Sequence, residues 1–126
     1  MALDLVDDNE LIAEYKRYHE SDKIWPEIVN GIRSVGILDM EIWQFDTHMF
    51  MIIEVPDDES FDIDKQLALL GTLDRQQEWE SLMWKFQKPL SRAKANEKWV
   101  RMERIFKLPW IIHHVLPPSL LHLLWS

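Results

Sequence analysis

The chain has 126 residues, and its 14 lysines and arginines are outnumbered by 22 aspartates and glutamates, which gives a formal net charge of −8. This length fits one domain whose core needs no disulfide or structural metal. The chain has no cysteine, so thiolate zinc sites and redox pairs are excluded. Nucleic acid is bound by neutralising phosphates with Lys and Arg, and the scattered basic residues predict no such partner.

The two ends of the chain differ from its body. The opening residues 1–4 have neither the basic n-region nor the apolar h-region of a secretory signal, so we expect a cytoplasmic protein. Residues 109–126 contain no Asp, Glu, Lys or Arg. We predict that they form an apolar tail outside a module of residues 1–108. The tail is too short to span a membrane, and Pro117-Pro118 breaks its one candidate helix.

Hydrophobic periodicity predicts a strand, two helices and a hairpin in the first half of the chain. Residues 2–6 alternate as a short strand, and Asp7 or Asp8 can cap a helix whose apolar side chains recur at helical spacing over residues 11–19. Pro26 suits the first turn of a second helix, which Gly36 closes. Residues 37–45 and 49–55 are β-rich and predict the two strands of a hairpin.

The second half predicts helices followed by one more strand. Residues 64–70 and 76–86 have a helical pattern, split at Gly71, and Pro89 ends the second of them. Residues 91–96 form a polar loop, and the alternation over residues 98–108 predicts the last strand. This βαββαβ order predicts an α+β, ferredoxin-like fold, a four-stranded antiparallel sheet with helices on one face. The other face needs a cover, so we expect a symmetric homodimer that closes two sheets into an α/β-barrel.

Tyr15 and His19 are the first candidates for chemistry. They are one helical turn apart, so a hydroxyl and an imidazole should emerge side by side from one helix face. Histidine titrates near neutrality and can act as acid or base, while tyrosine can hold a substrate oxygen. The pair can instead pack on the sheet as part of the core, with both polar ends satisfied.

Trp79, Glu80 and Met40 are further candidates for a binding pocket. Trp79 and Trp84 are separated by about 140° around a helix, so they do not share a face. A Trp beside a carboxylate suits a pocket for a sugar ring and its hydroxyls, although a core Trp next to a surface Glu is the commoner arrangement. Met40, on the first long strand, either lines such a pocket or fills the core.

We predict no metal or nucleotide site. The acidic residues between positions 57 and 64 lack the spacing of a calcium loop and suit a solvated loop and helix cap. Three histidines in the tail have no carboxylate or thiolate beside them, which favours adventitious metal binding over a designed site (His113, His114 and His122). With three glycines in the chain, neither a dinucleotide fingerprint nor a P-loop can be built.

Several segments together resemble the L-rhamnose mutarotase family. They are the Tyr15-x-x-x-His19 run, the Ile24-Trp25-Pro26-Glu27 segment, Gly36, the Gln77-x-Trp79 helix and the Met-Glu-Arg-Ile-Phe-Lys-Leu segment at 102–108. Any one of these motifs is weak by itself. A Tyr/His pair followed by Ile-Trp-Pro-Glu in this order of elements is fairly specific, and the resemblance covers about residues 2–108.

The resemblance implies a dimeric α/β-barrel enzyme without metal or cofactor, which interconverts the α and β anomers of L-rhamnose or a related deoxyhexose. It assigns His19 as the proton donor, and Tyr15, Met40, Trp79 and Glu80 as residues that bind the monosaccharide. The bacterial pattern has an aromatic residue at the Met40 position and a second Trp at the Glu80 position. Two other interpretations compete with the isomerase: a non-catalytic dimeric module that binds a small ligand, and a cofactor-free oxygenase of similar barrel plan.

Overall fold

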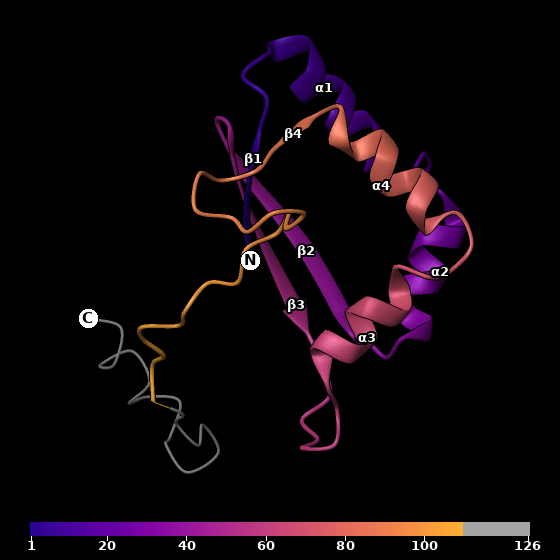
Figure 1. The fold of residues 1–126 in the computed structure, drawn as a ribbon, viewed down its shortest axis with the longest axis vertical. Coiled ribbons are helices and arrows are strands. Elements are labelled where there is room, and N and C mark those ends of the chain that lie inside the picture. Colours follow the sequence, from indigo (N-terminus) through magenta and orange to yellow (C-terminus); the bar gives the residue numbers. More distant parts are fainter. Residues whose placement is uncertain (110–126) are drawn as a thin grey trace, which may run out of the picture.

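Four helices and four strands make up the part of the chain that this computed structural model describes, residues 1–109. In chain order they are β1 (Ala2–Leu5), α1 (Asn9–Tyr18), α2 (Pro26–Ser34), β2 (Asp39–Phe45), β3 (His48–Glu54), α3 (Ile63–Leu70), α4 (Gln76–Trp84) and β4 (Gln87–Lys88). The strands pair antiparallel in the order β2-β3-β1-β4 (Figure 1). The predicted α+β, ferredoxin-like fold is confirmed.

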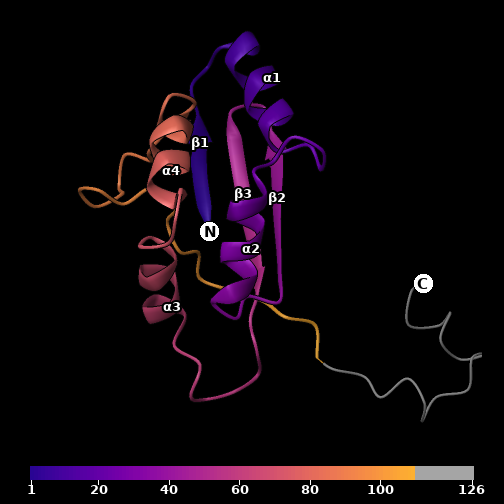
Figure 2. The ribbon, with the colours of Figure 1, turned by 90° about the vertical axis from the view of Figure 1, so that its right-hand side faces the viewer.

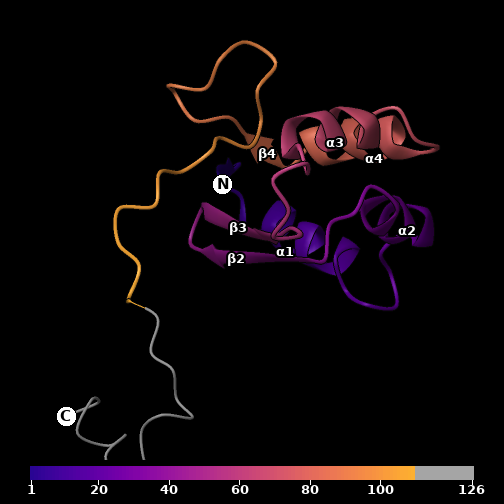
Figure 3. The same cartoon turned by 90° about the horizontal axis from the view of Figure 1, so that it is seen from below.

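The helices lie on one side of the sheet, in two columns. Figure 2 shows α1 above α2 in one column and α4 above α3 in the other. Figure 3 views the same columns from below, with α3 and α4 together and α2 apart from them. Side chains from both columns meet the inner face of the sheet, where the buried cluster includes Leu3 and Met49 from the strands and Ile28 and Met83 from the helices.

Local signals in the sequence explain where the first helices begin and end. Asp8 caps α1, because its carboxylate accepts hydrogen bonds from the backbone N–H groups of Glu10 and Leu11. Pro26 is the first residue of α2. Gly36, with φ of 91°, turns the chain out of α2 in the left-handed conformation that glycine tolerates best. These predicted boundaries are confirmed.

Two further loops also follow the sequence pattern. Asp62 caps α3 by accepting from the N–H groups of Asp64 and Lys65, so part of the acidic stretch serves as a helix cap, as predicted. Asp46 and Thr47 connect β2 to β3. The hairpin is confirmed, with His48 as the first residue of β3 rather than the last residue of the connection.

The predicted last strand over residues 98–108 is wrong. The fourth strand is β4, which pairs with Asp4 and Leu5 of β1, and of residues 98–108 only Val100 forms a bridge, to Ala2. Residues 101–108 have no regular structure and are exposed. The physical reason is that Val100 already meets the first residue of β1, so the residues after it have no further length of β1 to pair with. Alternation predicts which segment can be a strand, and the partner decides whether it is one.

No helix among the described residues has the length and apolar character needed to cross a membrane. The predicted apolar tail falls almost entirely on residues 110–126, which lie outside the described residues.

Gly36→Ala should lower the free energy of unfolding by about 1–3 kcal/mol, because alanine is strained at positive φ. A Cβ at this position would also lie 2.9 Å from the Phe61 ring. Gly71→Ala is the matched control. Gly71 has φ of −61° and leaves ordinary contact distances for a Cβ, so stability should stay level or rise by up to about 1 kcal/mol. Urea unfolding measures both changes, and equal effects would contradict the backbone argument.

Candidate functional site

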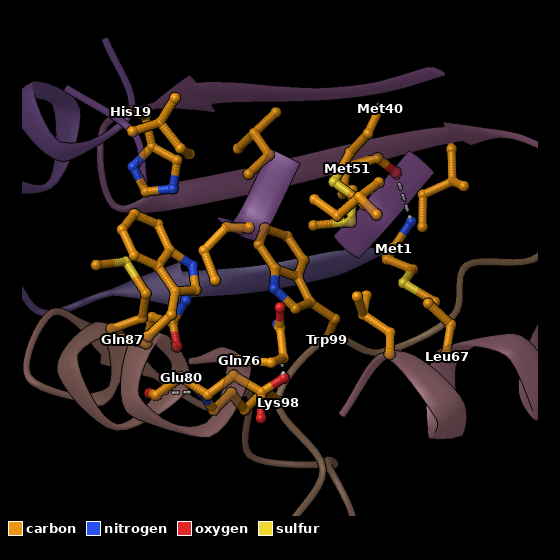
Figure 4. Close-up of a pocket in the computed structure, with 18 of the residues that line it drawn as sticks. Met1, His19, Met40, Met51, Leu67, Gln76, Glu80, Gln87, Lys98 and Trp99 are labelled. Carbon is orange, nitrogen blue, oxygen red and sulfur yellow. Dashed lines mark hydrogen bonds between the residues drawn. The ribbon is translucent and has the colours of Figure 1, made fainter. Parts of the chain in front are cut away.

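A cavity of about 290 Å³ lies between the two helix columns and the inner face of the sheet. Its volume is at the lower end of the range for ligand pockets, so it suits one small molecule. Most of the wall is apolar, with side chains from α2, α3, β2 and β3, including Ile28, Leu67, Met40 and Met51. Polar side chains gather at the other end (Tyr15, His19, Gln76, Glu80, Gln87 and Lys98), and Figure 4 shows most of them around the cavity.

Tyr15 and His19 lie side by side in this wall, as predicted. Their ring centroids are 4.4 Å apart, and Tyr15 is buried. The Nδ1 atom of His19 lies 2.7 Å from the backbone carbonyl oxygen of Tyr15. A carbonyl can only accept a hydrogen bond, so Nδ1 carries the proton and donates it. The second ring nitrogen, Nε2, therefore carries the lone pair that neutral His19 can offer to a ligand.

Burial sets the protonation states of this pair. It lowers the pKa of His19 below the ordinary value of 6.5, and the hydrogen bond to the Tyr15 carbonyl opposes this only in part. Burial also raises the pKa of the Tyr15 hydroxyl above 10.0, against a smaller opposing effect of Gln87. At neutral pH the site thus holds a neutral imidazole next to a protonated phenol.

Trp79 lies in an aromatic cluster beside His19. The two rings meet edge to face with centroids 5.4 Å apart, and Trp25 contacts Trp79 in the same way at 5.1 Å. Trp79 is 7% exposed, whereas Trp84 is 41% exposed. The prediction that these two tryptophans do not share a face is therefore confirmed, and Trp79 is the one that lines the cavity.

Glu80 and Met40 lie on opposite sides of the cavity (Figure 4). Gln76 donates a hydrogen bond from Nε2 to the Glu80 carboxylate at 3.2 Å. Lys98 donates from Nζ to the backbone carbonyl of Glu80 at 2.9 Å. Burial lowers the pKa of Lys98, and the nearby Glu80 charge partly offsets this. All five residues singled out from the sequence thus line one cavity.

Among the polar and aromatic residues that line the cavity, four were not singled out from the sequence: Gln76, Gln87, Lys98 and Trp99. Gln87 is buried, and its Nε2 donates a hydrogen bond to the Tyr15 hydroxyl at 3.4 Å. No local signal marked it, because Gln87 lies beyond the end of α4, in a strand of only two residues. Trp99 follows a loop and packs on the main core cluster, which no periodicity before it predicts.

The donor set of the cavity favours an uncharged, hydroxyl-bearing ligand. Within residues 1–109 no group of three or more His, Asp or Glu side chains is arranged to hold a metal ion. The polar groups are instead an imidazole, a phenol, two amides, a carboxylate and an amine. Together with the apolar wall they can bind a small polar molecule and move a proton at one point of it.

A ferredoxin-like domain with a phenol and an imidazole side by side in the wall of a small cavity is thus the class of protein that the fold and the site define. The family model for L-rhamnose mutarotase matches residues 1–108, and the chain belongs to this family. The chain is 40% identical to an L-fucose mutarotase from Xanthomonas campestris over 106 residues, and these residues cover 84% of this chain and 83% of the relative.

Two other relatives extend the comparison. A UPF0734 protein from Dictyostelium discoideum is 40% identical over 112 residues, which cover 86% of this chain and 87% of the relative. An L-rhamnose mutarotase from Burkholderia cenocepacia is 33% identical over 72 residues, which cover 56% of this chain and 62% of the relative. Membership of the family supports a sugar mutarotase activity.

We expect the imidazole of His19 to titrate below 6.5 and that of His48 above it. Burial disfavours the charged form of His19, whereas His48 is exposed and lies 2.9 Å from the Asp4 carboxylate, which raises its pKa. Because the folded pKa of His19 lies below 6.5, its contribution to stability is present above pH 6.5 and is lost as pH falls from there towards the folded pKa.

NMR titration of the histidine ring signals measures both values. The variants His19→Asn and His48→Asn assign the two resonances. A His19 pKa at or above 6.5 would contradict the buried environment described above.

Proposed function

We propose that the protein is a sugar mutarotase that interconverts the α and β anomers of L-rhamnose or a related deoxyhexose, with His19 as the proton carrier. The observation that carries the proposal is the pairing of buried Tyr15 with half-buried His19 in the wall of a cavity of about 290 Å³. Relatives named for L-fucose and for L-rhamnose support a deoxyhexose as substrate. Residues 1–108 form the mutarotase unit in this proposal, and residues 109–126 are an appendage to it.

Mutarotation requires two proton transfers at neighbouring oxygens. The anomeric hydroxyl O1 loses a proton and becomes the aldehyde oxygen, while the C1–O5 bond breaks and its electron pair takes up a proton at O5. Rotation about the C1–C2 bond then presents the other face of the carbonyl. Closure of the ring reverses both transfers and gives the opposite anomer.

His19 can serve both transfers through Nε2. Its Nδ1 proton is donated to the Tyr15 carbonyl, which fixes the tautomer and the orientation of the ring. Nε2 takes the proton from O1, and the imidazolium then gives a proton to O5. Burial disfavours the imidazolium, so the proton is passed on to the sugar rather than kept.

The other lining residues hold the sugar in this proposal. Tyr15 donates a hydrogen bond to a sugar oxygen near the reacting centre, and Trp79 packs on an apolar face of the ring. Met40 lies in the apolar part of the wall, where the methyl group of a 6-deoxy sugar would be accommodated. Glu80 accepts a hydrogen bond from a hydroxyl on the opposite side of the ring.

His19→Asn should lower the rate of anomer exchange by roughly 10²–10⁴-fold, because asparagine can still hydrogen-bond to the Tyr15 carbonyl but cannot carry a proton at this pH. Sugar binding should weaken far less. Tyr15→Phe should mainly weaken binding, since it removes a hydrogen bond and leaves the imidazole in place. Exchange NMR on L-rhamnose and L-fucose, normalised to folded protein, measures the rates.

The exposed His48 provides the matched control, and His48→Asn should exchange anomers at the wild-type rate. A wild-type rate in folded His19→Asn would overturn the catalytic assignment. Sugar binding by the wild type without any exchange would instead support the non-catalytic binding module.

The proposal includes a symmetric homodimer. Four large apolar side chains on the outer face of the sheet are between 43% and 79% exposed (Trp43, Phe45, Phe50 and Ile52). Trp43 faces Phe50 across β2 and β3, so these side chains form one continuous patch. Packing against a second copy removes such a patch from water, which favours association.

Light scattering of the wild type should give twice the 15.2 kDa mass of one chain. Ile52→Lys should shift the mass towards one chain, because a charge on the outer face must be desolvated in the dimer. The new lysine would face Glu41 across the strands, which preserves the sheet. Leu69→Lys, on the exposed side of α3, is the control and should leave the mass unchanged. A wild type of one-chain mass at micromolar concentration rules the dimer out.

A further inference from the structure

Gln87 combines three features in the cavity wall. Its side chain is 7% exposed. Its Nε2 donates a hydrogen bond to the Tyr15 hydroxyl at 3.4 Å. Its Oε1 is buried and has no hydrogen-bond partner among residues 1–109. Such an acceptor is costly in a core unless a ligand or water satisfies it, and Gln87 lines the cavity, so a ligand hydroxyl is a fitting partner for it.

We infer that Gln87 is a specificity-determining residue, whose amide Oε1 accepts a hydrogen bond from the sugar hydroxyl next to the anomeric carbon. The inference rests on the proposed function and names the part of the sugar that the site distinguishes. It goes beyond the five residues proposed above, because none of them is expected to read the configuration at that carbon.

The position of Gln87 relative to His19 indicates which hydroxyl it contacts. The imidazole must reach O1 and O5, both bonded to C1. Tyr15 packs against the imidazole at 4.4 Å between ring centroids, and the Gln87 amide is bonded to the hydroxyl of this same tyrosine. C2 is bonded to C1, so its hydroxyl is the nearest one to the reacting oxygens O1 and O5. We therefore place this hydroxyl at Gln87.

The hydrogen-bonding roles also match a hydroxyl group. Because the Tyr15 hydroxyl accepts from Gln87 Nε2, its own proton is free to be donated, and the unpartnered Oε1 belongs to the same amide. A donor and an acceptor side by side fit a hydroxyl, which gives one hydrogen bond and accepts another. Reversing the Gln87 amide exchanges the two roles but still leaves one amide atom for the sugar.

Glu80 is less suited to this role. Its carboxylate accepts from Gln76, and its backbone carbonyl accepts from Lys98. The C2 hydroxyl is a point at which deoxyhexoses differ, since it is axial in L-rhamnose and equatorial in L-fucose. A fixed acceptor at this place therefore discriminates between the two sugars, because only one orientation points at it.

The test compares each sugar with its analogue lacking the C2 hydroxyl. Anomer exchange is measured by NMR for L-rhamnose, L-fucose and their 2-deoxy forms, and each catalysed rate is divided by the uncatalysed rate of the same sugar. The wild type should favour the better hydroxyl-bearing sugar over its 2-deoxy form by about tenfold in kcat/KM. In Gln87→Met, which keeps the length and removes the amide, this ratio should fall to about one.

Gln66→Met is the matched control. Gln66 also donates from Nε2, to the backbone carbonyl of Val35 at 2.8 Å, and it does not line the cavity. This variant should lose stability and keep the wild-type sugar ratio. If Gln87 only supports the packing of Tyr15, Gln87→Met lowers kcat/KM for the hydroxyl-bearing sugar and for its 2-deoxy form by the same factor. The ratio of these two kcat/KM values then stays at its wild-type value, which overturns the inference.

The wild type alone decides the question if Gln87→Met does not fold. Equal kcat/KM for the hydroxyl-bearing and the 2-deoxy sugar then contradicts the inference, whereas a preference of about tenfold supports it. Failure of the proposed function is distinct, because in that case the wild type exchanges the anomers of none of these sugars.

Discussion

The burial of Leu3 and Leu5 on the central strand β1 holds the sheet and the cavity in place. Both side chains are almost completely inaccessible, and burying each contributes about 1.5–3 kcal/mol. A slip of one residue in the register would turn them to the outer face, so the pairing of β1 with β3 and β4 is strongly specified. In this register Ala2 forms a bridge to Val100. The residue before Val100 in the sequence, Trp99, lines the cavity. The same four-residue strand thus positions the wall of the site and limits how far the sheet extends.

The site is part of the core rather than a depression on the surface. Tyr15, Trp79 and Met83 belong to the main core cluster and also line the cavity. Close packing restricts the rotamers of these side chains, so their polar neighbours are oriented before a ligand arrives. The cost is that the imidazole and the amine near the cavity are both held in an environment that disfavours their charge. For such residues, stability and chemistry have to be measured separately.

Regular elements and the residues they carry could be predicted from the sequence, because periodicity and caps are local. The Tyr15–His19 pair follows directly from helical spacing, and the α1 cap follows from Asp8. The failures depend on partners distant in sequence. Residues 98–108 alternate like a strand, but pairing depends on how many residues β1 offers. Gln87 and Lys98 lie in a two-residue strand and after a loop, where no local pattern shows which side chains turn inward.

Residues of two hydrophobic clusters line the cavity, and this arrangement has a thermodynamic consequence. Trp79 and Met83 belong to one cluster and Leu70 to the other, while Ile32 packs against both. A small molecule between them adds contacts that the empty protein lacks, and a ligand that binds only the folded state shifts the folding equilibrium by mass action. At one hundred times its dissociation constant it contributes about 2.7 kcal/mol. The melting temperature of this chain therefore acts as a label-free gauge of cavity occupancy, and it ranks sugars by affinity whether or not their anomers are interconverted.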